Sequence, residues 1–92
     1  MAKSFFIFSR SAERDLSKLG TEVRRQILKK LRWYSELEDP MDSAEPIKNE
    51  PPLTHRFRFG GWRVFGVWLQ REQQFLVTEI KRRGQAYKQK RR

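Results

Sequence analysis

Residues 53–69 alternate between apolar and polar side chains around two adjacent glycines, Gly60 and Gly61. Aromatic and β-branched residues, which favour strands, stand on both sides of this pair, and a two-glycine loop suits the tight turn of a β-hairpin. Counting outward from the loop pairs Phe59 with Trp62, Arg58 with Arg63, Phe57 with Val64, and Arg56 with Phe65. The pattern therefore predicts a central β-hairpin with a defined register.

The same counting divides the side chains of the hairpin between two faces, because side chains alternate along a strand. One face carries His55, Phe57, Phe59, Trp62, Val64 and Trp68. The other face carries Arg56, Arg58 and Arg63 beside Phe65, Val67 and Leu69. Like charges opposite each other destabilise a strand pair, whereas guanidinium groups bind phosphate bidentately. The arginines therefore indicate a phosphate-binding face, with arginines that simply extend into solvent as the alternative.

The N-terminal half has the pattern of one strand followed by two helices. The apolar run 4–9 predicts a strand buried on both faces. Residues 11–19 predict a helix, capped by Ser9 or Ser11 and ended by Gly20. A second helix is expected from Thr21, as its cap, to about Leu37. Its apolar stripe is Val23, Ile27, Leu31 and Tyr34, widened by Leu28 and Leu37, and its basic face is Arg24, Arg25, Lys29, Lys30 and Arg32.

A loop rich in proline and acidic residues is expected at 38–52. It contains the acidic patch of the chain, which can lie near the arginines or apart from them. A last strand is expected at 75–82, after a polar turn. If that turn has an even number of residues, Arg82 joins the arginine face and Glu79 faces the helices as a structural partner. The same register places Trp68 opposite Phe75 and Arg63 opposite Ile80.

The size and composition of the chain narrow the choice of partner. The chain has 92 residues, no cysteine and a net charge of +10, so we expect one small domain, 1–92, in a reducing, cytoplasmic compartment. From Arg56 onward there are eleven Lys and Arg but two Glu, and the basic excess continues into a tail at 84–92. This basic C-terminal half predicts a polyanionic partner, most simply nucleic acid. A membrane surface and an acidic protein are the alternatives. No apolar run is long enough to span a membrane.

Taken together, the patterns predict an α+β fold in the order β-α-α-β-β-β. About four antiparallel strands are expected, with the two N-terminal helices packed on one face of the sheet. In this order the sequence resembles the RelE/ParE superfamily of toxins from bacterial toxin–antitoxin modules, and the RelE-like branch in particular. Three segments carry the resemblance: 8–16 at the first helix, 56–64 at the hairpin, and 80–83 followed by Tyr87.

The resemblance implies a function and a set of site residues. RelE-like toxins are ribosome-dependent endoribonucleases that cut mRNA in the ribosomal A site, and they need no metal or other cofactor. By match, the catalytic positions are Arg56, Arg58, Arg63, Arg82 and Tyr87. Lys81, Arg83, Lys88 and Lys90 are expected to bind RNA. The implied partners are a cognate antitoxin, the 70S ribosome and mRNA.

One departure from the RelE-like pattern concerns proton transfer. These toxins often have lysines before the hairpin, where this chain has Arg56 and Arg58. Arginine keeps its proton at working pH, so neither can act as a general base. The identity of the general base therefore stays open. The resemblance makes Tyr87 the candidate for activating the 2′-hydroxyl or for stacking on a base, and His55 is expected to be structural. The alternatives are a ParE-like inhibitor of DNA gyrase and a basic nucleic-acid-binding module without catalysis.

Overall fold

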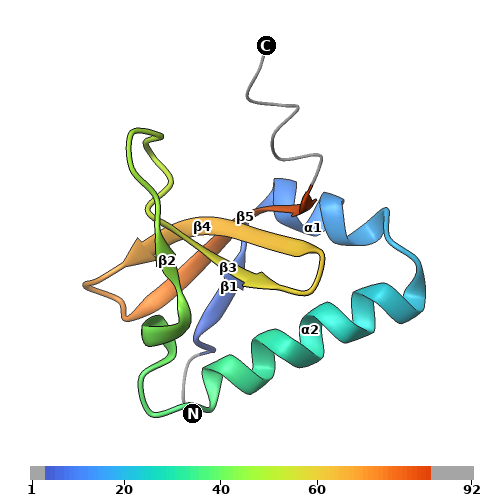
Figure 1. Ribbon diagram of the computed structural model, residues 1–92, viewed down its shortest axis with the longest axis horizontal. Coiled ribbons are helices and arrows are strands. Elements are labelled where there is room, and N and C mark those ends of the chain that lie inside the picture. The colour runs from blue at the N-terminus through green and yellow to red at the C-terminus, as the bar shows by residue number, and fades with distance from the viewer. Residues whose placement is uncertain (1–3, 84–92) are drawn as a thin grey trace.

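The computed structural model describes residues 4–83 and has two helices packed on one face of a five-stranded sheet (Figure 1). The strand order in the sheet is β1-β5-β4-β3-β2. The elements are β1 (Phe6–Phe8), α1 (Arg10–Ser17), α2 (Thr21–Ser35), the 3-10 helix η1 (Pro40–Ser43), β2 (Glu45–Pro46), β3 (His55–Phe59), β4 (Trp62–Leu69) and β5 (Gln74–Arg82). The predicted α+β class, with both helices packed on the sheet, is confirmed.

The sheet differs from the prediction in two details at its edges. β1 runs parallel to β5, with Phe6 beside Phe75, so the sheet is mixed and not wholly antiparallel. β2 is a fifth strand of two residues, formed inside the expected loop and paired with the start of β3. β1 is also shorter than expected and only its first residue is buried, because it lies at an edge and the chain enters α1 two residues later.

The central hairpin has the predicted register at every position. The pairs are Phe59 with Trp62, Arg58 with Arg63, Phe57 with Val64, and Arg56 with Phe65. Gly60 has φ +58°, a backbone conformation that glycine adopts without strain. The glycine pair therefore fixes the turn, and the turn fixes which side chains share a face.

A β-bulge changes the register of β5 against β4. The pairs from Trp68 with Phe75 to Gly66 with Val77 follow the expected register. Phe65 then pairs with Glu79, which leaves Thr78 as an extra residue. Arg63 therefore pairs with Lys81 and not with Ile80. The faces of the following residues are reversed: Ile80 is buried in the core, Arg82 shares the helix side with Trp62, and Glu79 faces away from the helices. The predicted positions of Arg82 and Glu79 were wrong for this reason.

Side chains and backbone from the start of α1 continue the edge of the sheet where β1 ends. The Ser9 backbone N–H donates to the Val77 carbonyl oxygen at 2.9 Å, and the Ser11 hydroxyl donates to the Thr78 carbonyl at 2.8 Å. Farther along, the Ile80 N–H donates to the Asp15 carboxylate at 2.9 Å. These contacts satisfy backbone groups on the edge of β5 that would otherwise have no strand beside them.

The core lies between the helices and the inner face of the sheet. Its buried members include Ala12, Leu16, Ile27, Leu31, Tyr34, Phe57, Val64, Phe75, Val77 and Ile80. The predicted stripe of α2 is confirmed, although Leu28 does not widen it and remains 40% exposed. Gly20 is the N-cap of α2 and does not end α1, whose C-cap is Lys18, and Thr21 is already helical. The helices thus cover one face of the sheet, and Arg56, Arg58 and Arg63 lie on the other.

Candidate functional site

Three arginines come together on the sheet face that lies away from the helices. β3 and β4 place Arg58 directly opposite Arg63, and Arg56 lies two residues along β3 on the same face. Arg63 is held by a hydrogen bond from its Nη1 to the Trp62 carbonyl oxygen at 3.1 Å. The juxtaposition predicted from the hairpin register is confirmed, and it concentrates positive charge on one surface.

A carboxylate from the acidic loop lies against two of these arginines. Because β2 pairs Glu45 with Arg56, the Glu45 side chain reaches the guanidinium groups of its neighbours on β3. Its Oε1 accepts a hydrogen bond from Arg56 Nε at 2.9 Å, and its Oε2 lies 3.5 Å from Arg58 Nη1. The sequence left open whether the acidic loop approaches the arginines, and the structure places Glu45 among them.

Lys81 near the end of β5 and Arg83 just after it extend the group. Lys81 pairs with Arg63 across the strands and so shares its face. The charge of Arg83 also acts on Arg63, and the Arg83 N–H donates to the Gly61 carbonyl oxygen at 2.9 Å. We call the set Arg56, Arg58, Arg63, Lys81 and Arg83 the cationic cluster. It brings cations from β3, β4 and the C-terminal end of β5 to one site.

The electrostatics of the cationic cluster favour an anion. Burial lowers the pKa of the Arg63 guanidinium, and the positive charges of Arg58, Arg83 and Arg56 lower that pKa further. Glu45 has the opposite effect on this pKa but is a single carboxylate. The cluster also borders an apolar residue, because Phe65 pairs with Arg56 and is 9% exposed. A phosphate group would relieve the repulsion among these cations.

Several predicted site residues lie elsewhere. Arg82 is on the helix side of the sheet, where its guanidinium carbon lies 5.1 Å from the centre of the Trp62 ring. Its place near Arg63 is taken by Lys81 and Arg83, which the sequence assigned to RNA binding. Tyr87, Lys88 and Lys90 fall outside the residues that the structure describes.

His55 lies apart from the cationic cluster, as its position in the hairpin register predicted. It shares the helix-facing side with Phe57, and its Nδ1 lies 2.8 Å from the Thr54 hydroxyl oxygen. Burial lowers the pKa of the imidazole below 6.5. The ring is therefore positioned by its neighbour Thr54, on the side of the sheet away from the cationic cluster.

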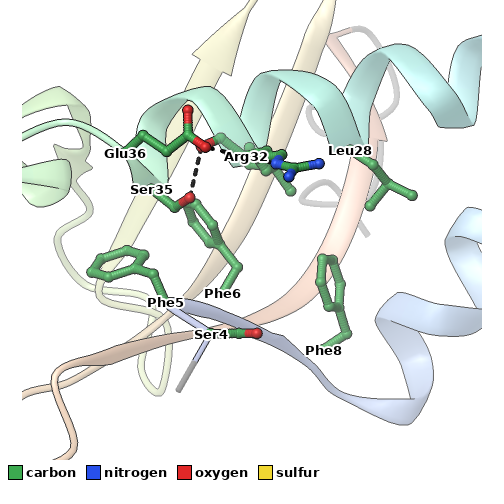
Figure 2. Close-up of a pocket in the computed structure, with 9 residues that line it drawn as sticks. Ser4, Phe5, Phe6, Phe8, Leu28, Arg32, Ser35 and Glu36 are labelled. Carbon is green, nitrogen blue, oxygen red and sulfur yellow. Dashed lines mark hydrogen bonds and ion pairs between the residues drawn. The ribbon is translucent and has the colours of Figure 1, made fainter. Parts of the chain in front are cut away.

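Two hollows among the described residues lie along α2, away from the cationic cluster. Figure 2 shows a groove between β1 and α2 that is lined mainly by Phe5, Phe6, Phe8 and Leu28, with a volume of about 360 Å³. The Arg32 and Glu36 side chains at its rim form an exposed ion pair at 3.7 Å. Among residues 4–83, no group of three or more His, Asp or Glu side chains is arranged to hold a metal ion. None of the helices within that range is sufficiently long and apolar to span a bilayer.

Sequence reasoning missed the contact of Glu45 and the displacement of Arg82. Nothing in the loop sequence fixes which of its acids reaches the arginines, because a loop has no periodic pattern. The displacement had a local indication in Gly66, since a lone glycine within a strand often marks a bulge. A Cβ on Gly66 would overlap the Leu76 carbonyl oxygen and lie 2.7 Å from a ring carbon of Phe75.

Comparisons with known proteins show a shared fold. No protein-family model matches the chain, and no curated protein matches it. Among solved structures, the RelBE2 toxin–antitoxin complex from Mycobacterium tuberculosis matches with a TM-score of 0.72 and 18% identity, over 89% of this chain and 100% of that chain. The intact RelBE complex of E. coli matches with a TM-score of 0.64 and 21% identity, over 87% of this chain and 96% of that chain. The RelE–RelB complex of Pyrococcus horikoshii matches with a TM-score of 0.65 and 16% identity, over 89% of this chain and 98% of that chain.

The fold and the site together define a class of protein: a small α+β domain that packs both helices on one face of its sheet and presents clustered cations on the other. Within that class, the chain has the fold of the RelE toxins. The isolated RelE toxin of E. coli has the same fold, with a TM-score of 0.61 and 19% identity over 95% of this chain and 98% of that chain.

Proposed function

We propose that this protein is the toxin of a toxin–antitoxin module and acts as a ribosome-dependent endoribonuclease that cuts mRNA in the A site. One observation carries the proposal: five cations and one carboxylate meet on the face of the sheet that the helices leave open. The RelE fold supports it, since structures with this fold are RelE toxins and RelB–RelE complexes. Cleavage without a metal ion needs this combination of charge and proton acceptor.

The cations of the cluster would stabilise the phosphate of the transition state. RNA cleavage by its own 2′-oxygen passes through a phosphorus with five oxygen neighbours and added negative charge. Arg63, Lys81 and Arg83 are suited to bind this phosphate, because none of the three has a carboxylate within ion-pair distance in the described chain. Fixed cations in a partly buried site are effective for this purpose because they need not reorganise during reaction.

Glu45 would remove the proton from the attacking 2′-hydroxyl. Arginine cannot serve, because it stays protonated, whereas a carboxylate can accept a proton. The 2′-oxygen then bonds to phosphorus, and the bond to the 5′-oxygen breaks as that oxygen takes up a proton from water. The products are a 2′,3′-cyclic phosphate and a 5′-hydroxyl end. Tyr87 remains a second candidate for activating the 2′-hydroxyl, as the family resemblance implies.

Arg56 and Arg58 would have a different role from the other cations. Both are paired with Glu45 at 2.9 and 3.5 Å, so each holds the carboxylate in position and has less charge to offer a phosphate. They would also contact the flanking phosphates of the strand. Arg82 lies over Trp62 and would support the fold at this end of the sheet.

A cognate antitoxin is the second partner of the proposed toxin. The RelBE structures with this fold are complexes of a toxin and an antitoxin. The net charge of +10 favours an antitoxin segment rich in acidic residues. Such a segment would neutralise the cationic cluster and keep the protein inactive in the cytoplasm.

The test is a map of mRNA 3′ ends on purified ribosomes stalled with a defined A-site codon. Wild type is compared with Arg63→Met, which keeps much of the side-chain volume but removes the charge. The proposal requires cuts within the A-site codon, cyclic phosphate products, and loss of those cuts in the variant. A folded wild type that arrests growth without cutting mRNA would refute the nuclease, and a DNA gyrase supercoiling assay would then test the ParE-like alternative.

A further inference from the structure

We propose that Trp33 and Lys30 on α2 form a stacking site for one unpaired base of the RNA strand bound at the cationic cluster. The inference rests on the proposed RNA-binding function but adds a site on the other side of the sheet edge. It is motivated by an aromatic side chain that the core leaves half exposed: Trp33 is 51% exposed, while the adjacent Tyr34 is 7% exposed.

Lys30 holds the exposed indole in a defined environment. Its Nζ lies 4.3 Å from the centre of the Trp33 ring and 5.2 Å from that of Tyr34. The Trp33 ring in turn packs edge to face on Tyr34, with ring centres 5.4 Å apart. A base that stacked on the free part of this indole would bring its phosphate close to the Lys30 ammonium group. Aromatic rings beside cations are the usual way in which proteins bind single-stranded RNA.

A short chain of contacts connects this pair to the cationic cluster. The Tyr34 hydroxyl donates to the Arg58 carbonyl oxygen at 3.5 Å, so Trp33 is two contacts away from a member of the cluster. β2 pairs with β3 only at His55 and Arg56, which leaves the edge of β3 beyond Arg56 without a neighbouring strand in the described chain. An RNA strand with a phosphate at Arg58 can therefore pass around this open edge and reach Trp33.

The charges near Trp33 also fit an RNA strand. Lys29 lies one helical turn before Trp33 and adds a second ammonium group beside Lys30. The acidic residues of this helix and its cap are already paired: Glu22 lies 3.5 Å from Arg25, and Glu36 lies 3.7 Å from Arg32. Lys29 and Lys30 therefore place two ammonium groups on the part of α2 that carries the indole, which suits a nucleotide.

The test measures binding without cleavage. Fluorescence anisotropy follows wild type, Trp33→Ala and Leu28→Ala with a short 2′-O-methyl oligoribonucleotide, whose blocked 2′-oxygen cannot react. A second oligonucleotide has the same backbone with abasic positions. We expect Trp33→Ala to weaken binding of the first about tenfold, as loss of one stacking aromatic does, and to leave binding of the abasic strand unchanged. Leu28→Ala is the matched control, because Leu28 is also exposed on α2, and it should change neither affinity.

The outcomes separate this site from the proposed function. If wild type binds neither oligonucleotide, both the RNA-binding cluster and the stacking site are wrong. If wild type binds through Arg63 and Trp33→Ala has no effect, or weakens both strands equally, the stacking site alone is wrong. Trp33→Phe serves as the check on folding, because it retains an aromatic ring and should keep most of the affinity.

Discussion

Replacement of Glu45 by Gln is expected to change RNA binding and RNA cleavage in opposite directions. The substitution keeps the shape of the side chain and its position opposite Arg56 but removes its charge. The protein should remain folded, because the Glu45 and Arg56 side chains are 41% and 36% exposed. An ion pair this open to solvent contributes about 0.5 kcal/mol to the free energy of unfolding.

The effect on affinity follows from the lost negative charge. A phosphate in the cationic cluster would lie about 5 Å from the carboxylate, where repulsion between unit charges in a water-like medium is about 0.8 kcal/mol. Removing that repulsion should tighten binding of an uncleavable oligoribonucleotide about fourfold. The gain should shrink at high salt, because the cluster is partly open to solvent.

The effect on the reaction follows from the lost proton acceptor. Removal of a general base slows a reaction by about 100-fold or more, so the single-turnover cleavage rate on saturated ribosomes should fall by at least that factor. Tighter binding combined with slower cleavage is a result that a purely structural role for Glu45 cannot produce.

The matched control is Glu79→Gln. Glu79 is a second carboxylate on the same face of the sheet, but it pairs with Phe65. Its loss should tighten binding slightly and leave the cleavage rate unchanged. If Glu45→Gln cleaves at the wild-type rate, the carboxylate is a counter-ion alone and the proton acceptor must be sought elsewhere. If it weakens binding, the carboxylate is needed to hold the arginines in position.

Three further predictions concern stability. Arg63→Met should raise the melting temperature slightly, because burial and neighbouring cations already lower the pKa of that guanidinium; a sharply lower melting temperature would contradict the electrostatic argument. Burial lowers the pKa of His55 below its unfolded value of 6.5, so its contribution to stability is present above that pH and is lost as pH falls through the folded pKa. Urea unfolding between pH 7 and 5 should therefore depend less on pH in His55→Gln, and mRNA cleavage should be nearly unchanged; a hundredfold loss of cleavage would contradict the structural role. Gly66→Ala should cost about 3 kcal/mol or more, because its Cβ would overlap the Leu76 carbonyl oxygen; a thermal melt that matches wild type would show that β5 can shift at the bulge.

The hairpin and its arginines could be predicted because their positions depend on local sequence. Gly60-Gly61 defines the turn, and counting from it places Arg58 opposite Arg63. The position of Arg82 depends on the bulge at Thr78 in β5. A single extra residue there moves every later side chain of the strand to the opposite face of the sheet. The Glu45 contact depends on the path of an irregular loop, which no periodic pattern describes. The parallel direction of β1 depends on how two helices return the chain to the sheet, which is a property of the whole fold.

The pairing of β1 with β5 has a consequence for the synthesis of the protein. Phe6 lies beside Phe75, so the first strand finds its partner only after nearly seventy further residues have been made. Phe75 and Val77, both fully buried, also belong to this last strand. A nascent chain halted before residue 75 therefore has neither a closed core nor a complete sheet, and contacts so distant in sequence form slowly. The cationic cluster itself needs Lys81 and Arg83. The cationic cluster is consequently assembled only once the last strand has left the exit tunnel of the ribosome.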